Sequence, residues 1–150
     1  MANIFHEDFR DFLSALNKAD VRYILVGGYS VVLHGYSRTT GDMDLWVERS
    51  SENYNRIINA FQIFGMPLFD MTESNFLSHP IWDVFTFGTP PVAIDIMVKI
   101  EGLNFDDVFQ KAVYFEDDDI RIRTINRNDL ITAKKMAGRA KDINDLENLE

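Results

Sequence analysis

Cysteine is missing from this chain of 150 residues. The protein can therefore form no disulfide, and it has no thiolate to serve as a nucleophile or a metal ligand. Because a chain without disulfides is compatible with a reducing compartment, we expect a cytoplasmic location.

Long apolar runs are also absent. No stretch of the sequence approaches the roughly 18 consecutive apolar residues that indicate a membrane-spanning helix. The first residues include His6, Glu7 and Asp8 and lack the basic region and apolar stretch of a secretory signal. We therefore expect no membrane partner.

Positive charge is scarce. The chain has 15 Lys and Arg against 24 Asp and Glu, which gives a net charge of −9. Binding to a phosphate backbone needs clustered Lys and Arg, so we do not expect nucleic-acid binding without a partner. A magnesium ion changes the local charge, so an acidic chain can still bind a nucleoside triphosphate.

What the chain does contain is enough apolar material for one domain, residues 1–150: its hydrophobic content is 46%. Helical spacing over 6–19 and 51–64, strand-like stretches and a helical tail from residue 126 predict an α+β (α/β) fold. We expect a mixed, partly antiparallel sheet of about four or five strands, with helices on one face and a C-terminal helical segment. Residues 69–78 are compatible with a weak strand or a loop, and 112–115 and 120–124 with short edge strands.

The stretch from Ile24 to Val47 concentrates the functional signals. An apolar strand at 23–26 is followed by Gly27 and Gly28, a short helix at 29–34, a polar turn at 37–41 and a second strand at 42–47. Glycine allows positive φ and close approach of a ligand, and the N–H groups at a helix start favour phosphate.

Two carboxylates open the second of these strands. Asp42 and Asp44 are two residues apart, so they point to the same face. They repel each other unless a cation or a proton lies between them, and hard oxygen ligands suit Mg²⁺, which also takes substrate phosphates. In this order the features predict a site for a magnesium–nucleoside triphosphate. The simpler alternative is a glycine hairpin followed by a solvated acidic strand start.

Three polar residues are further candidates, each with a simpler alternative. Ser30 could reach a phosphate or be an ordinary helix residue. Arg38 could bind a phosphate through two hydrogen bonds or pair with a carboxylate. Lys134 could reach the nucleotide from the apolar face of the last helical segment or belong to a charged helix surface.

A later apolar strand contains a lone carboxylate, Asp95, which is unfavourable there unless it is bound or lies at a strand end. It could be a third metal ligand or a hydrogen-bonded strand-end residue. Asp83 lies in another apolar stretch and competes for the same role.

The glycine pair, the Asp-x-Asp at Asp42 and Asp44, and the later Asp95 together resemble the signature of the DNA polymerase beta-like nucleotidyltransferase superfamily. Residues 29 to 41 separate Gly28 from Asp42. Asp95 is preferred over Asp83 because it matches the later-strand carboxylate of that signature. The tail KKMAGRAKD also resembles a Lys-x-x-x-x-Arg-x-Lys-Asp helix of small bacterial nucleotidyltransferase-like proteins.

This resemblance implies a nucleotidyltransferase-type sheet and the transfer of a nucleoside monophosphate from a nucleoside triphosphate, with ATP as the expected donor, to a hydroxyl, with release of pyrophosphate. Asp42 and Asp44 would hold two Mg²⁺ ions, and Asp95 would complete the metal site and help to deprotonate the acceptor. Gly27, Gly28 and Ser30 would cradle the phosphates.

The resemblance leaves the acceptor open among a small molecule such as a drug, a partner protein and an RNA. The rival hypothesis is a non-catalytic nucleotide-binding or toxin–antitoxin interaction module of the same fold. The presence of all three carboxylates favours the enzyme.

Overall fold

The computed structural model of the protein describes residues 5–36, 38, 40–89 and 91–149. Within them the helices are α1 (Glu7–Lys18), α2 (Gly27–Leu33), α3 (Ser51–Phe64), α4 (Glu73–Ser78), α5 (Phe105–Gln110), α6 (Arg127–Ala137) and α7 (Ala140–Leu149). The strands are β1 (Tyr23–Val26), β2 (Met43–Val47), β3 (Val84–Thr89), β4 (Val92–Met97), β5 (Val113–Asp117) and β6 (Ile120–Thr124). Two residues of the predicted polar turn, 37 and 39, lie outside the described residues.

The strands form one mixed sheet in the order β3-β4-β2-β1-β6-β5. The pairs β3–β4, β1–β2 and β5–β6 are antiparallel, whereas β2–β4 and β1–β6 are parallel. The predicted fold class, a mixed and partly antiparallel sheet with a C-terminal helical segment, is confirmed. The sheet has six strands because the β5–β6 hairpin joins it through β1. This long-range pairing places β6 inside the sheet, not at its edge.

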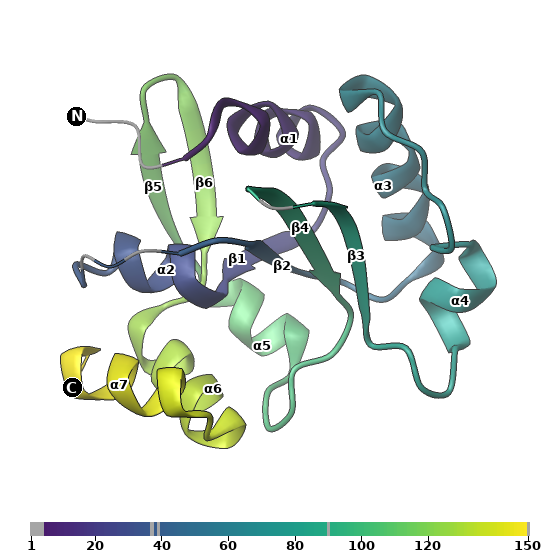
Figure 1. Cartoon of the computed structure of the whole chain (residues 1–150). Helices are drawn as coiled ribbons and strands as arrows, with labels where there is room; N and C mark the ends of the chain where they lie inside the picture. Colours follow the sequence, from purple (N-terminus) through teal and green to yellow (C-terminus); the bar gives the residue numbers. More distant parts are fainter. Residues whose placement is uncertain (1–4, 37, 39, 90, 150) are drawn as a thin grey trace.

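Helices cover both faces of the sheet, which corrects the expectation of helices on one face (Figure 1). Side chains alternate along β1, so Tyr23 and Leu25 pack in one core with α1 and α3. Ile24 and Val26 pack in a second core with residues of α5, α6 and α7. All four residues of β1 are buried, and a strand that is apolar on both faces needs a helical layer on each.

The start of α6 is fixed by a capping side chain, and its end is fixed by a glycine. The Asn126 side chain accepts a hydrogen bond of 2.9 Å from the Asp129 backbone N–H and starts α6. Gly138 ends it at a φ of 64°, in the left-handed region that glycine tolerates best. The chain then turns into α7, and the two helices pack against each other.

Residues 69–78 contain a helix that periodicity did not reveal. The Thr72 side chain accepts a hydrogen bond of 3.2 Å from the Asn75 backbone N–H at the start of α4. Because α4 has only 6 residues, it is too short to display a clear helical repeat. In the described part of the chain no helix is both long and apolar enough to cross a membrane.

Candidate active site

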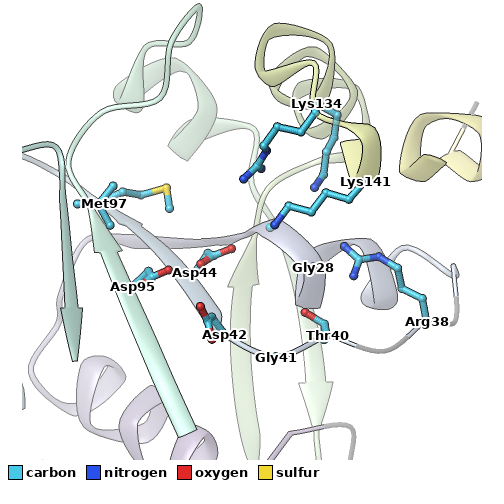
Figure 2. Close-up of a pocket in the computed structure, with 13 residues that line it drawn as sticks. Gly28, Arg38, Thr40, Gly41, Asp42, Asp44, Asp95, Met97, Lys134 and Lys141 are labelled. Carbon is cyan, nitrogen blue, oxygen red and sulfur yellow. The ribbon is translucent and has the colours of Figure 1, made fainter. Parts of the chain in front are cut away.

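A cavity of about 470 Å³ opens where β2, β4 and α2 meet the C-terminal helices (Figure 2). Its lining includes Asp42, Asp44 and Asp95, which we call the acidic floor. It also includes Arg38, Lys134, Arg139 and Lys141, so both signs of charge line one space.

The acidic floor is assembled by strand pairing. Asp44 on β2 and Asp95 on β4 are direct partners in the parallel β2–β4 register, and both are half-buried. Asp42 is exposed just before β2, and Figure 2 shows its carboxyl group close to the other two. Asp95 therefore lies beside Asp44, as the superfamily pattern predicts, whereas Asp83 does not line the cavity.

Burial and mutual repulsion disfavour the ionised form of Asp44 in the acidic floor. Burial and then the neighbouring Asp95 raise the pKa of Asp44 to about 7, Asp42 adds to this shift, and Lys141 opposes it. The Thr86 hydroxyl donates a hydrogen bond of 2.7 Å to Asp95. Asp44 thus favours retention of its proton in the absence of a cation.

The donor set fits magnesium bound together with a substrate. Among the described residues no group of three or more His, Cys, Asp or Glu side chains forms a metal cage by itself. Magnesium commonly uses one or two carboxylates and completes its shell with water and substrate phosphates. Asp42 and Asp44 supply hard oxygens of this kind, and a cation there would relieve the repulsion that raises the pKa of Asp44.

The glycine pair lies against the acidic floor and forms the first residues of α2 (Gly27–Leu33), which corrects the prediction of a turn followed by a helix at 29–34. Gly27 has a φ of 69°, and a β-carbon on it would collide with the Asp44 carboxylate. Gly28 does not have positive φ, and a β-carbon there would collide with the Thr40 hydroxyl and lie 3.1 Å from Nη2 of Arg38. Gly27 is therefore required by its conformation and Gly28 by the close approach of Thr40.

Ser30 is separated from the other candidates. It is fully buried, and its hydroxyl oxygen accepts a hydrogen bond of 3.0 Å from the Thr124 hydroxyl. It is not among the cavity-lining residues. The structure does not bring the Ser30 side chain to the position that the sequence analysis expected.

Lys134 and Arg38 do line the cavity, as part of an ion-paired cluster. Lys134 Nζ lies 3.1 Å from Asp142 Oδ1 and 3.0 Å from Asp145 Oδ2. Arg38 approaches the same Asp145 with Nε at 2.8 Å from Oδ1 and Nη2 at 3.0 Å from Oδ2. Arg139 Nε donates a bond of 2.7 Å to Asp142 Oδ2. We call these five residues the ion-paired wall.

The acidic side chains of the wall are buried and paired with cations. The side chains of Lys134, Asp142 and Asp145 are 6%, 0% and 1% exposed. Burial by itself raises the pKa of Asp142, but hydrogen bonds from Arg139 and Lys134 outweigh burial and hold that pKa below its usual value. Both carboxylates of the wall are therefore matched by cations, in contrast to those of the floor.

Sequence reasoning gave no specific role to several residues here. Thr40, Arg139 and Lys141 line the cavity, and the last two belong to the Lys-x-x-x-x-Arg-x-Lys-Asp pattern of the tail. That pattern was the signal for them. Asp145 had no signal, because its role depends on Arg38, which is 107 positions away.

The sequence from residue 5 to residue 150 matches the model of a family described as nucleotidyltransferases of unknown function (DUF6036). The chain belongs to this family. The resemblance inferred from the glycine pair and the aspartates is thereby confirmed. No curated protein matches the sequence.

Solved structures of similar proteins share the fold of this family member. A Thermotoga maritima protein provisionally assigned as a nucleotidyltransferase has a TM-score of 0.56 and 14% identity, over 93% of this chain and 88% of that one. The lincosamide antibiotic adenylyltransferase LnuA, with lincomycin bound, has a TM-score of 0.56 and 18% identity, over 99% of this chain and 98% of that one. Both likenesses support a nucleotidyltransferase-type sheet.

Proposed function

We propose that the protein transfers a nucleoside monophosphate from a nucleoside triphosphate, most simply ATP, to a hydroxyl group and releases pyrophosphate. One observation carries this proposal. Three carboxylates with a raised Asp44 pKa share a cavity with a glycine pair and basic side chains. A metal–triphosphate complex has the charge distribution that such a cavity complements.

Asp42 and Asp44 are the residues that would hold two Mg²⁺ ions, with Asp95 as the third carboxylate. Bound magnesium supplies charge neutralisation to the triphosphate and the leaving pyrophosphate. Gly28 allows the Thr40 hydroxyl to approach the backbone at the start of α2, and Lys141, which also lines the cavity, would add positive charge beside the phosphates.

In the reaction the acceptor hydroxyl oxygen bonds to the α-phosphorus, and the bond from that phosphorus to the bridging α–β oxygen breaks. Asp95 is placed to accept the hydroxyl proton, since its carboxylate lies at the β3–β4 side of the floor. The proton acceptor and the phosphate-binding glycine pair are thus on opposite sides of Asp44.

We propose a small molecule as the acceptor. A groove of about 180 Å³ follows the edge strand β3, and it shares Val84 with the site cavity. Phe69, Trp82 and Phe85 are among its lining residues, and its only charged lining residue is Asp70. An acidic, aromatic groove disfavours an RNA phosphate backbone and favours a neutral or cationic molecule with an apolar face. The shared fold with LnuA, an enzyme that adenylylates a small antibiotic, agrees with this class.

The test is incubation of the protein with a cell extract, Mg²⁺ and ATP labelled at the α-phosphate. We expect label in a low-molecular-weight product, with none when the label is on the γ-phosphate or when EDTA is present. Asp44→Asn should abolish the transfer. Metal-dependent ATP binding by the parent without any pyrophosphate release would favour the non-catalytic module, and absence of ATP binding would reject both hypotheses.

A further inference from the structure

A second, smaller cavity of about 130 Å³ adjoins the site between the end of β4 and helix α6. It shares Gly27, Asp44, Met97, Lys134 and Arg139 with the larger cavity. Because five lining residues are common to both, the two cavities adjoin each other.

The smaller cavity is lined by four charged residues, Asp44, Lys134, Arg139 and Asp142, and the rest of its lining is apolar. Its walls include Ile100 beyond β4, and Leu130, Ala133 and Ala137 on α6. Leu130, Ala133 and Ala137 recur at helical spacing on one face of α6. The side chains of Ala133 and Ala137 are small and leave open space beside α6. The cavity is therefore a slot between α6 and the chain around Met97.

The two cations that line the slot, Lys134 and Arg139, already pair with Asp142, so neither is left unpaired for a phosphate group, which needs N–H donors or cations. A flat heteroaromatic ring does suit the slot. Such a ring buries its apolar faces against Ile100 and the alanines, and the Met97 sulfur provides a favourable contact for an aromatic ring.

We propose that this slot binds the nucleobase of the triphosphate, with Ala133 and Ala137 as the residues that keep it open. The inference rests on the proposed function, because it divides one nucleotide between two adjoining cavities. The triphosphate occupies the larger cavity, and the base occupies the slot.

The position of the slot favours a base over an acceptor. Asp44 and Lys134 line it, whereas Asp95 does not. An acceptor hydroxyl has to meet the proton-accepting Asp95, which lies on the β3 side of Asp44. A group bound in the slot therefore lies next to the triphosphate site, on the side of Asp44 away from the acceptor hydroxyl.

The experiment compares ATP with inorganic tripolyphosphate, which has the charged chain and no base. Both are titrated calorimetrically into the full chain with Mg²⁺. We expect the parent to bind ATP about tenfold or more tightly than tripolyphosphate, and Ala133→Leu and Ala137→Leu to reduce this advantage to about twofold or less. Affinity for tripolyphosphate should stay within about twofold of the parent in both variants.

Thr132→Leu is the matched control, because it adds an apolar side chain to the exposed face of the same helix. It should leave the ATP advantage unchanged. Ala137 is itself exposed, so its leucine variant tests the slot even if Ala133→Leu fails to fold.

Each outcome is decisive. If the preference for ATP over tripolyphosphate is lost in the two slot variants and kept in Thr132→Leu, the slot binds the base. An ATP advantage that survives Ala137→Leu, or a parent that binds tripolyphosphate as tightly as ATP, overturns the slot and leaves the triphosphate site standing. If the parent binds neither ligand, the proposed function fails and the slot fails with it.

Discussion

Two charged regions meet at the same cavity, and Figure 2 shows Asp42, Asp44 and Asp95 of the acidic floor and Arg38 and Lys134 of the ion-paired wall. The two regions differ in how their charges are balanced. In the ion-paired wall, Asp142 and Asp145 are each contacted by two basic side chains: Lys134 contacts both, Arg139 contacts Asp142 and Arg38 contacts Asp145. In the acidic floor, carboxylates face one another, and the pKa of Asp44 rises to about 7.

We expect this difference to separate charges that support the structure from charges that bind a ligand. A buried charge with well-placed partners stabilises the arrangement around it, and removing one partner is costly. Carboxylates held together without compensation are unfavourable in the free protein, and a bound cation makes them favourable. The wall is therefore expected to support the C-terminal helices, and the floor to bind ligand.

The largest expected effect comes from a substitution in the acidic floor that leaves the ion-paired wall unchanged. Asp95→Asn removes the proton acceptor and one of the three carboxylates, so pyrophosphate release from ATP and Mg²⁺ should slow by roughly 100-fold or more. The melting temperature should not fall. Asp83→Asn is the control, since Asp83 does not line the cavity. A parent-like rate in the Asp95 variant would remove this residue from the proposed mechanism.

Breaking the wall should mainly affect stability. Lys134→Ala leaves two buried carboxylates with fewer partners, which should cost about 3 kcal/mol and lower the melting temperature by roughly 6–12 °C. Lys135→Ala, on the exposed face of α6, should change stability by less than about 0.5 kcal/mol. Thermal melts of the two variants side by side provide the comparison, and equal melting temperatures would mean that the wall is not structural.

The pH dependence of stability sharpens the contrast further. Because the folded-state pKa of Asp44 is raised to about 7 from 3.8, the parent binds an extra proton when folded, and it loses stability as pH rises through about 7. Asp44→Asn cannot ionise, so in EDTA it should exceed the parent by on the order of 2 kcal/mol at pH 8 and by less at pH 5.

Urea unfolding from pH 5 to pH 8 measures this difference. Added Mg²⁺ at pH 8 should stabilise the parent and not the asparagine variant. A stability gap that is the same at every pH would contradict the assigned proton.

The smallest expected effect concerns the glycine pair between the two regions. A β-carbon at Gly28 would displace the Thr40 hydroxyl, so Gly28→Ala should weaken ATP binding by about tenfold, or 1.4 kcal/mol. Because Gly28 does not have positive φ, no backbone strain is expected and the melting temperature should change little. Calorimetric titration and a thermal melt separate these quantities. A variant that melts earlier but binds ATP like the parent would show that the glycine pair is purely structural.

Local patterns were enough to select several of the residues that line the cavity. Gly27, Gly28, Asp42 and Asp44 lie within one short stretch, where glycine chemistry and the two-residue repeat of a strand determine what they can do. For Arg38 the sequence leaves phosphate binding and carboxylate pairing open, and for Lys134 it leaves nucleotide contact and a charged helix surface open. The structure shows that both pair with carboxylates and both line the cavity.

The sequence by itself determined the residue types, the mixed fold class and the chemistry of the floor, because these depend on neighbours along the chain. Only the tertiary structure decided that Asp95 pairs with Asp44, that Ser30 is buried, and that α6 forms a slot beside the floor. The parallel β2–β4 pairing and the contact between Arg38 and Asp145 connect distant positions. Such contacts arise from burial of the whole chain, which no local spacing records.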